Sequence, residues 1–344
     1  MRKPYNGTED NDRDIPGNGV GEGGSIPSGF SPSQYLSDME KPGFLKMIRI
    51  GGLIAMIPPL LIGTIVAFRI QGNVDLTSFL LACIVGFSLH ISMNVYNDIY
   101  DTEQGSDTLE SSRSLFSGGS GALIENPGLK DKMLWISRFG ILIAFLGTLG
   151  LLYLLETGLW PGMISVFGSM AFLSKFYTAE PIKLAYRSLG EITVWFGFGP
   201  LAILLATTAQ GVGFDHLVLL TMPITGLSTL TFSWGGEMAD MPYDREAGKI
   251  GLAIRIGIEK SVYVLAALHI LIILNVYVIS QITGTGHFMF VPLIPYVISV
   301  SIAFKTLLED PSDRKNILKG TKINFIGFLI FSAGIIFSFA FLIL

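Results

Sequence analysis

Polar and acidic side chains gather at the end of an apolar stretch that covers about residues 79–97. Asp98 and Asp101 follow this stretch directly. If the helix continues to residue 101, Asn97 and Asp101 are four residues apart and lie on one helix face. Asn94 continues the same face toward the membrane interior. The pattern predicts a helix end that presents amide and carboxylate oxygens in one direction.

A second acidic cluster ends another apolar stretch, at about residues 215–235. Asp240 and Asp244 are again four residues apart, and Glu237 lies three residues before Asp240. Pro242 stands inside this cluster, so the sequence predicts either a kinked helix or a new helix at that point. The two clusters share the spacing that places two carboxylates on one face.

Carboxylates at the membrane face are costly, and those of two neighbouring helix ends repel one another. A bound cation removes both penalties. Oxygen ligands without histidine or cysteine favour Mg²⁺, which also bridges phosphate oxygens. We therefore expect the two helix ends to meet around Mg²⁺ and a diphosphate. The basic residues expected to hold the diphosphate are Arg113, Lys175, Arg187, Arg245, Lys249 and Arg255.

Apolar stretches long enough to cross a bilayer recur along the chain, because each has close to the ~20 residues that a spanning helix needs. The sequence predicts an all-α membrane bundle of nine transmembrane helices that occupies residues 41–344. Residues 1–40 are polar and predict a disordered tail. The nine expected spans cover about 50–69, 79–97, 133–155, 159–177, 190–209, 215–235, 261–281, 287–304 and 323–344.

The composition excludes several classes of protein. Half of the residues are hydrophobic and 15% are charged, and the mean hydropathy is +0.56. These values rule out an ordinary soluble domain, a disordered protein and a coiled coil. A net charge of −4 gives no reason to expect nucleic acid as a partner. The single cysteine, Cys83, excludes a disulfide framework.

The basic residues predict the orientation in the membrane. With nine spans, the N-terminal tail and the even-numbered connections share one side and hold nearly all lysines and arginines. The odd-numbered connections carry only Arg69, at the edge of the first span. The excess of basic residues on cytoplasmic loops then places the tail and both acidic clusters on the cytoplasmic side of the cell membrane.

Several motifs together resemble those of one enzyme family. The pattern N-x-x-N-D-x-x-D-x-x-x-G-x-D is matched by Asn94, Asn97, Asp98, Asp101, Gly105 and Asp107. The pattern D-x-x-x-D-x-x-x-G-K, followed by R-x-G, is matched by Asp240, Asp244, Gly248, Lys249, Arg255 and Gly257. Further matches are Arg49, Pro59, Gly63, Tyr177, Thr178, Pro181, Tyr186, Arg187, Leu189, Gly190 and Glu191. The chain therefore resembles the UbiA superfamily of intramembrane prenyltransferases, and most of all its 1,4-dihydroxy-2-naphthoate polyprenyltransferases of menaquinone synthesis.

The chain also departs from the family pattern. Ala239 stands where many members have Arg, and Glu237 stands where many have Asn. Ile50 replaces the proline that usually follows the first Arg. The first two changes adjoin the expected metal site, so they bear on the identity of the acceptor more than on the fold.

The resemblance implies transfer of a polyprenyl group from its diphosphate to an aromatic acceptor, with carbon–carbon bond formation. For dihydroxynaphthoate, CO₂ and diphosphate would leave. The implied Mg²⁺ ligands are Asn97, Asp98, Asp101, Asp240 and Asp244. The implied diphosphate contacts are Lys175, Arg245, Lys249 and Arg255. Tyr96, Tyr100 and Tyr177 are expected to stabilise the allylic cation. Asp107 and Glu237 are the two alternatives for polarising the acceptor hydroxyl, and Asn94, Arg113 and Arg187 are expected to line the substrate site.

Alternatives remain at this point. Other superfamily members use 4-hydroxybenzoate, chlorophyll-type or glyceryl-phosphate acceptors, but the Gly118-Gly119-Ser120-Gly121 stretch favours the naphthoate branch. A CDP-alcohol phosphotransferase also uses intramembrane aspartates, in a motif that this chain lacks. A cation transporter would carry its acidic residues near the bilayer centre, whereas both clusters here stand at helix ends.

Overall fold

The computed structural model describes residues 42–108 and 119–340 of the chain. All the secondary-structure elements within these ranges are helices, so the all-α prediction is confirmed for the described residues. They belong to a compact unit that begins at Pro42. The predicted tail at 1–40 and the loop residue Arg113 lie outside the described residues.

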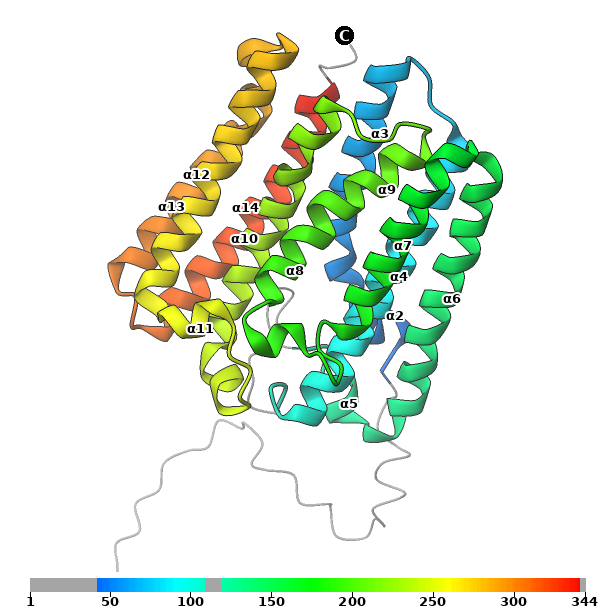
Figure 1. Cartoon of the computed structure of the whole chain (residues 1–344). Coiled ribbons are helices and arrows are strands. Elements are labelled where there is room, and N and C mark those ends of the chain that lie inside the picture. The colour runs from blue at the N-terminus through cyan, green and yellow to red at the C-terminus, as the bar shows by residue number, and fades with distance from the viewer. Residues whose placement is uncertain (1–41, 109–118, 341–344) are drawn as a thin grey trace, which may run out of the picture. The chain divides into compact units, whose positions relative to one another are not determined.

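The described residues contain eight helical segments long and apolar enough to cross a membrane, against the nine expected. The expected span that is not among the eight is the fourth, at 159–177; it corresponds to α7 (Trp160–Phe176), whose 17 residues lie at the lower limit for crossing a bilayer. The eight longer segments are η1–α3 (Ile50–Gln71), α4 (Leu76–Gln104), η2–α6 (Pro127–Leu154), α8–η5–α9 (Gly190–Ala209), α10 (His216–Glu246), α12 (Ile258–Thr283), η6–α13 (Gly286–Glu309) and α14 (Arg314–Ala340). These long helices lie side by side, as Figure 1 shows.

Short helical segments fill several of the connections. They are α2 (Phe44–Met47), α5 (Ala122–Glu125), η3 (Thr157–Leu159), η4 (Leu184–Arg187) and α11 (Leu252–Ile256). The helix α2 lies just before the first spanning segment. The connections that carry η4 and α11 lead into α8 and α12, so they lie next to the ends of spanning helices.

Local signals fix both ends of α4. The Asp75 carboxylate accepts a hydrogen bond from the Ser78 N–H at 2.6 Å, which caps the first turn. At the other end Gly105 has φ +80°, a left-handed conformation that glycine adopts without strain. Because the chain reverses there, the Ser106 N–H donates back to the Asp101 carbonyl at 2.9 Å. The first acidic cluster is therefore held in the last turn of a fixed helix end.

The second acidic cluster lies wholly on α10. This helix runs from His216 to Glu246 through Pro223 and Pro242, so Pro242 does not begin a new helix. Proline lacks the N–H that would bond to the carbonyl four residues earlier, but the surrounding turns hold the helix in register. The Pro242 side chain faces outward and is exposed.

Small residues allow the helices to approach closely, as is usual in membrane proteins. A Cβ placed on Gly63 of α3 would lie 2.6 Å from the Ala206 Cβ of α9. A Cβ on Gly226 of α10 would lie 2.3 Å from the carbonyl oxygen of Trp195. Such contacts are too short for real atoms, so these crossings require glycine.

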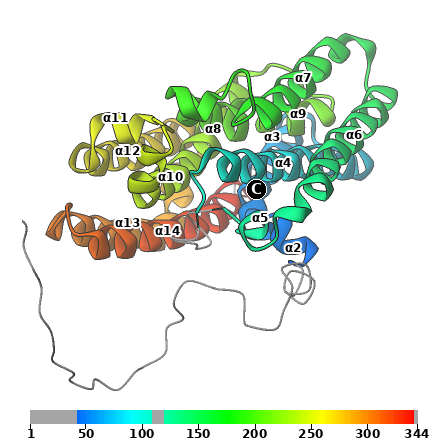
Figure 2. The ribbon, with the colours of Figure 1, turned by 90° about the horizontal axis from the view of Figure 1, so that it is seen from below.

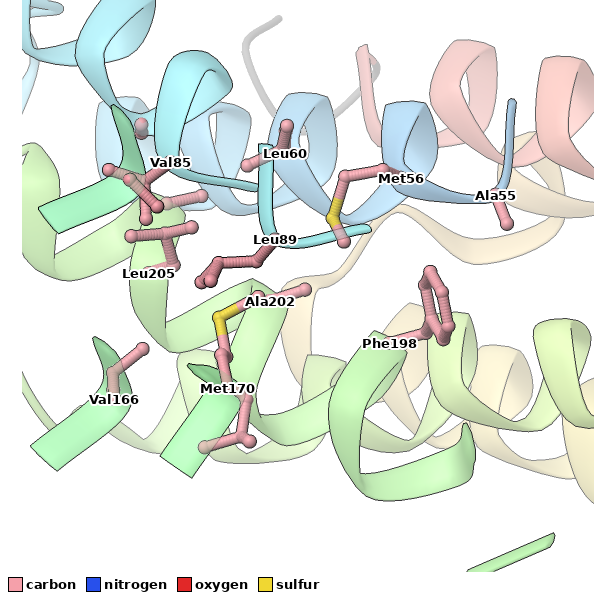
Figure 3. Packing of buried hydrophobic residues seen from close by; sticks show 14 of the residues in the cluster. Ala55, Met56, Leu60, Val85, Leu89, Val166, Met170, Phe198, Ala202 and Leu205 are labelled. Atoms are coloured by element: carbon pink, nitrogen blue, oxygen red, sulfur yellow. The ribbon is translucent and has the colours of Figure 1, made fainter. Parts of the chain in front are cut away.

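A buried apolar cluster joins α3, α4, α7 and the α8–η5–α9 span. In Figure 3, Met56 and Leu60 face Leu89, Met170 and Leu205 across the space between the helices. These side chains are almost fully buried. The cluster fixes the positions of the helices that carry one wall of the site described below.

Outward-facing side chains of the bundle are apolar. On α6, Leu142, Phe145, Leu146 and Leu149 are all exposed, and Phe337 of α14 is exposed as well. Exposing so large an apolar surface to water is unfavourable, whereas contact with lipid tails carries no such penalty. The exposed faces therefore agree with a multi-pass membrane protein.

Replacing Gly63 by alanine is expected to destabilise the protein. The added methyl group would meet Ala206 and the carbonyl of Ile203, at 2.6 and 3.2 Å. Overpacking of this kind costs roughly 1–3 kcal/mol, so the unfolding midpoint in detergent should fall. The matched control is Gly168→Ala in α7, where nothing lies within 4 Å of the new Cβ. Equal midpoints for the two variants would show that the α3–α9 crossing tolerates a side chain.

Candidate active site

Both acidic helix ends face one cavity of about 440 Å³. The ends of α4 and α10 meet there, and Figure 2 shows them beside each other when the protein is seen from below. The predicted site residues that line the cavity are Asn94, Asn97, Asp101, Asp107, Tyr177, Glu237, Asp240, Asp244 and Lys249. The prediction that the two clusters converge is therefore confirmed.

Lys249 links the two clusters. Its Nζ lies 2.8 Å from Asp101 Oδ2 and 3.6 Å from Asp244 Oδ1. The two carboxylates are 3% and 4% exposed, so without a cation their repulsion would be screened little by water. Ser106 Oγ adds a hydrogen bond to Asp244 Oδ1, so the turn after α4 is also tied to α10. The ammonium group stands where a cation is needed between the two helix ends.

A chain of hydrogen bonds orients the amide of Asn97. Arg49 donates to Asn97 Oδ1 at 2.7 Å, and Asn97 Nδ2 donates to Asp101 Oδ2 at 2.8 Å. Tyr186 completes the set, because its hydroxyl donates to Asp101 Oδ1 at 2.9 Å. Both oxygens of Asp101 therefore have partners from three separate segments of the chain.

The loop that returns from α4 closes over two further carboxylates. Ser120 donates to Asp98 Oδ1 through its backbone N–H and to Asp98 Oδ2 through its hydroxyl. The Gly119 N–H donates to Asp107 Oδ1 at 3.0 Å. A Cβ on Gly119 would lie 1.8 Å from Asp107 Oδ2, so only glycine fits at this position. Asp98 does not line the cavity, since Ser120 lies between.

Burial and neighbouring charges shift the pKa values of Asp107, Lys249 and Tyr186, which lie just beyond the helix ends. Burial, followed by the negative charge of Asp101, raises the pKa of Asp107 to about 7. Burial lowers the pKa of Lys249, but Asp101 and Asp244 raise it more, so its pKa lies well above the usual value. Burial and the neighbouring Asp101 also raise the pKa of Tyr186. Lys249 is thus a permanent cation, and Tyr186 remains a hydrogen-bond donor.

Another part of the cavity wall is apolar. Ala55, Val194, Phe198 and Phe232 line it, and the ring of His90 packs edge-on against Phe198 at 4.8 Å between centroids. His90 is thus a packed residue of the wall. A cavity with one charged end and one apolar wall suits a substrate that has a charged head and a hydrocarbon tail.

Four predicted basic residues lie elsewhere in the structure. Lys175, Arg187, Arg245 and Arg255 are exposed, and none of them lines the cavity. Lys175 lies over the ring of Phe176, at 5.2 Å from its centroid. Arg187 donates to the carbonyl of Pro181 at 3.0 Å. Their predicted contact with a diphosphate stays a prediction.

The sequence did not assign a role to three residues that the structure places at the site. Arg49 and Tyr186 belong to the matched motifs, and Ser106 lies between Gly105 and Asp107. They are polar residues inside motifs, and that is the only signal that could have selected them. Asn94, which was predicted to line the site, donates to the carbonyl of Ile48 at 3.3 Å and also faces the cavity.

The site residues fit Mg²⁺ only as partial ligands. Within residues 42–108 and 119–340, no three acidic, histidine or cysteine side chains lie close enough to hold an ion alone. Asp107 Oδ2 is buried and receives no hydrogen bond from the described residues. Mg²⁺ usually takes one or two carboxylates and completes its shell with water and substrate phosphates. The oxygens at this cavity suit that mode of binding.

Comparison with known proteins identifies the class. The model of the UbiA prenyltransferase family matches residues 56–329, so the chain belongs to this family. The chain is also similar to a solved UbiA homologue from Archaeoglobus fulgidus bound to DMAPP and Mg²⁺. That likeness has a TM-score of 0.57 at 14% identity and covers 86% of this chain and 99% of that one, and it supports the shared fold.

The chain is also similar in sequence to two named prenyltransferases. The chain is 29% identical to the 1,4-dihydroxy-2-naphthoate octaprenyltransferase of Bacillus subtilis over 251 aligned residues. The aligned region covers 72% of this chain and 74% of the relative. The chain is 24% identical over 229 residues to the 2-carboxy-1,4-naphthoquinone phytyltransferase of Synechocystis sp., which covers 67% and 69%. The protein is a prenyltransferase of the UbiA family.

Tyr186→Phe is expected to lower prenyltransferase activity about tenfold. The variant removes the hydroxyl that donates to Asp101 Oδ1, and a hydrogen bond to a charged group contributes about 1.5–3 kcal/mol. The measurement is the steady-state rate of product formation in detergent. Tyr153→Phe is the matched control, because Tyr153 is 89% exposed. An unchanged rate for Tyr186→Phe would remove this hydrogen bond from the working site.

Proposed function

We propose that this prenyltransferase transfers a polyprenyl group from its diphosphate to 1,4-dihydroxy-2-naphthoate, with loss of CO₂ and diphosphate, as a step of menaquinone synthesis. The observation that carries the proposal is the meeting of the two acidic helix ends around Lys249 on one cavity. The two relatives named above support the acceptor, because both act on naphthalene-ring substrates by name.

The chain would assist the breaking of the allylic C–O bond through charge. Negative charge builds on the departing diphosphate, and fixed positive groups in a poorly solvated site stabilise it strongly. Lys249 and Arg49 line the cavity and point their charges at its acidic end. Mg²⁺ would supply further positive charge to the diphosphate oxygens when bound. Its ligands would come from Asn97, Asp101, Asp240 and Asp244, which line the cavity, with Asp98 behind them.

The apolar wall would guide the tail and exclude water. The allylic cation reacts with water if water reaches it, so the site must be dry where the cation forms. Phe198, Phe232 and Val194 line that part of the cavity. Tyr177, which also lines it, offers an aromatic face that stabilises a cation by roughly 0.5–2 kcal/mol.

We also propose that the protein spans the cell membrane with both acidic clusters on the cytoplasmic side. The basic residues of the even-numbered connections support this orientation. The test uses single-cysteine variants, Asn73→Cys and Ser312→Cys, each made in a protein that also carries Cys83→Ala. In intact cells, a membrane-impermeant maleimide should label the Asn73→Cys variant and leave the Ser312→Cys variant unlabelled. Labelling in the opposite pattern would invert the proposed orientation.

Asp101→Ala and Asp240→Ala are each expected to abolish Mg²⁺-dependent transfer. Each removes a carboxylate from the cavity, where charge on the diphosphate must be balanced. The assay is formation of prenylated product by purified protein in detergent, with Mg²⁺ and a polyprenyl diphosphate. Asp131→Ala is the control, because Asp131 is exposed in the first turn of α6. Wild-type rates in both site variants would remove these residues from the reaction.

The same assay tests the acceptor when it is run with a panel of aromatic acids. Mass spectrometry of the products should show the prenylated ring without its carboxyl group when 1,4-dihydroxy-2-naphthoate is offered. Turnover of 4-hydroxybenzoate, or of a glyceryl phosphate lipid, with none of dihydroxynaphthoate would replace the proposed acceptor while leaving the reaction class intact.

A further inference from the structure

Two buried side chains near the start of α8 hold the backbone that follows the cavity lysine. The Ser188 hydroxyl donates to the carbonyl of Ile250 at 2.5 Å. Glu191 Oε1 accepts a hydrogen bond from the N–H of Leu252. Ser188 is 9% exposed and Glu191 is 2% exposed, so water competes little for these backbone groups. One side chain thus donates to this segment and the other accepts from it, on the two sides of a single residue.

The segment held in this way lies between α10 and α11, where residues 249–251 are outside any helix. Backbone groups of such a stretch need partners from other parts of the chain. The Lys249 N–H donates back to the carbonyl of Asp244 at 2.8 Å. A Cβ on Gly251 would lie 3.0 Å from Glu191 Oε1, so the glycine lets that carboxyl group approach the backbone. Contacts from the α8 side therefore fix a stretch that α10 alone does not hold.

The connection before α8 also reaches the side chain of Lys249. Lys249 Nζ lies 5.9 Å from the centroid of the Tyr186 ring, and the hydroxyl of the same tyrosine donates to Asp101. Two residues after Tyr186, Ser188 binds the backbone next to Lys249. Lysine has a long and flexible side chain, so contacts at its ammonium group and at its backbone together restrict where its charge can stand.

The backbone of Ser188 indicates that its hydroxyl is used. Ser188 has φ +58°, a left-handed conformation that costs free energy in a residue with a side chain. Glycine would adopt this conformation without strain. Glycine would also leave the carbonyl of Ile250 without its donor. A strained serine at the end of η4 is therefore accounted for by the hydrogen bond that it makes.

We propose that Ser188 and Glu191 are positioning residues that hold Lys249 at the charged end of the cavity. Neither of them lines the cavity, so both act through the backbone of the α10–α12 connection. Lys249 is the residue that would contact the diphosphate, and in that respect the inference rests on the proposed function. It requires no contact between these two residues and the acceptor.

The experiment removes each backbone contact separately. Ser188→Gly suits the left-handed φ and deletes the hydroxyl. Glu191→Leu removes the acceptor of the Leu252 N–H, whereas Glu191→Gln keeps a side-chain oxygen there. The control is Ser301→Ala, which deletes an exposed hydroxyl that bonds to a carbonyl of its own helix, α13. Three quantities are measured: the affinity for inorganic diphosphate by calorimetry, kcat/KM for a polyprenyl diphosphate, and KM for dihydroxynaphthoate.

Loss of one hydrogen bond should weaken diphosphate binding in Ser188→Gly by about three- to tenfold, and kcat/KM for the prenyl diphosphate should fall by a similar factor. Glu191→Leu should lose roughly tenfold or more, while Glu191→Gln should stay within about threefold of wild type. KM for the acceptor should stay within about twofold, and the unfolding midpoint of Ser188→Gly should match that of Ser301→Ala.

Wild-type diphosphate binding in Ser188→Gly would overturn the role of Ser188, and equal losses in Glu191→Leu and Glu191→Gln would overturn that of Glu191. An equal rise in KM for the acceptor with a lower unfolding midpoint would also overturn the proposal, because it indicates general damage. If Glu191→Leu fails to fold, Ser188→Gly decides. Failure of the proposed function looks different: the wild-type protein would form no product from dihydroxynaphthoate, and the diphosphate titration would still test the positioning role.

Discussion

The structure depends on bringing buried negative charges of two helices to one place without water to screen them. Asp101 on α4 and Asp244 on α10 could not lie this close at such low exposure unless a cation lay between them. Lys249 supplies that cation from the connection after α10. The same charges that make this end of the bundle costly also make it able to bind a cation and a diphosphate.

The fold turns this constraint into a fixed geometry. Gly105 reverses the chain after α4, and Ser106 then bonds to Asp244 on α10. The glycine contacts within the bundle hold α3 against α9 and α10 against the α8–η5–α9 span. A site that must pair charges within hydrogen-bonding distance needs elements that do not slide, and close helix packing provides them.

Much of this arrangement could be predicted from the sequence, and the reasons are physical. Spans such as α4 and α12 follow from apolar length, and the i, i+4 spacing of Asp240 and Asp244 places them on one face of α10. The count of nine differed from the eight full-length spans described, because α7 is short. Spacing along one helix cannot show partners from distant segments of the chain. The hydrogen bonds from Arg49 to Asn97 and from Tyr186 to Asp101 could therefore not be predicted. Exposed Lys175 and Arg255 show that a basic residue near a motif need not face the site.

The positions of the charged groups suggest a division of labour within the cavity. Lys249 contacts Asp101 and Asp244 at the charged end, whereas Phe198 and Phe232 line an apolar part of the wall. A diphosphate needs fixed charges close to its oxygens, because these stabilise the negative charge that builds as the C–O bond breaks. An allylic cation needs a wall that keeps water away, because water would react with it. The two parts of one cavity therefore meet opposite demands of the same substrate.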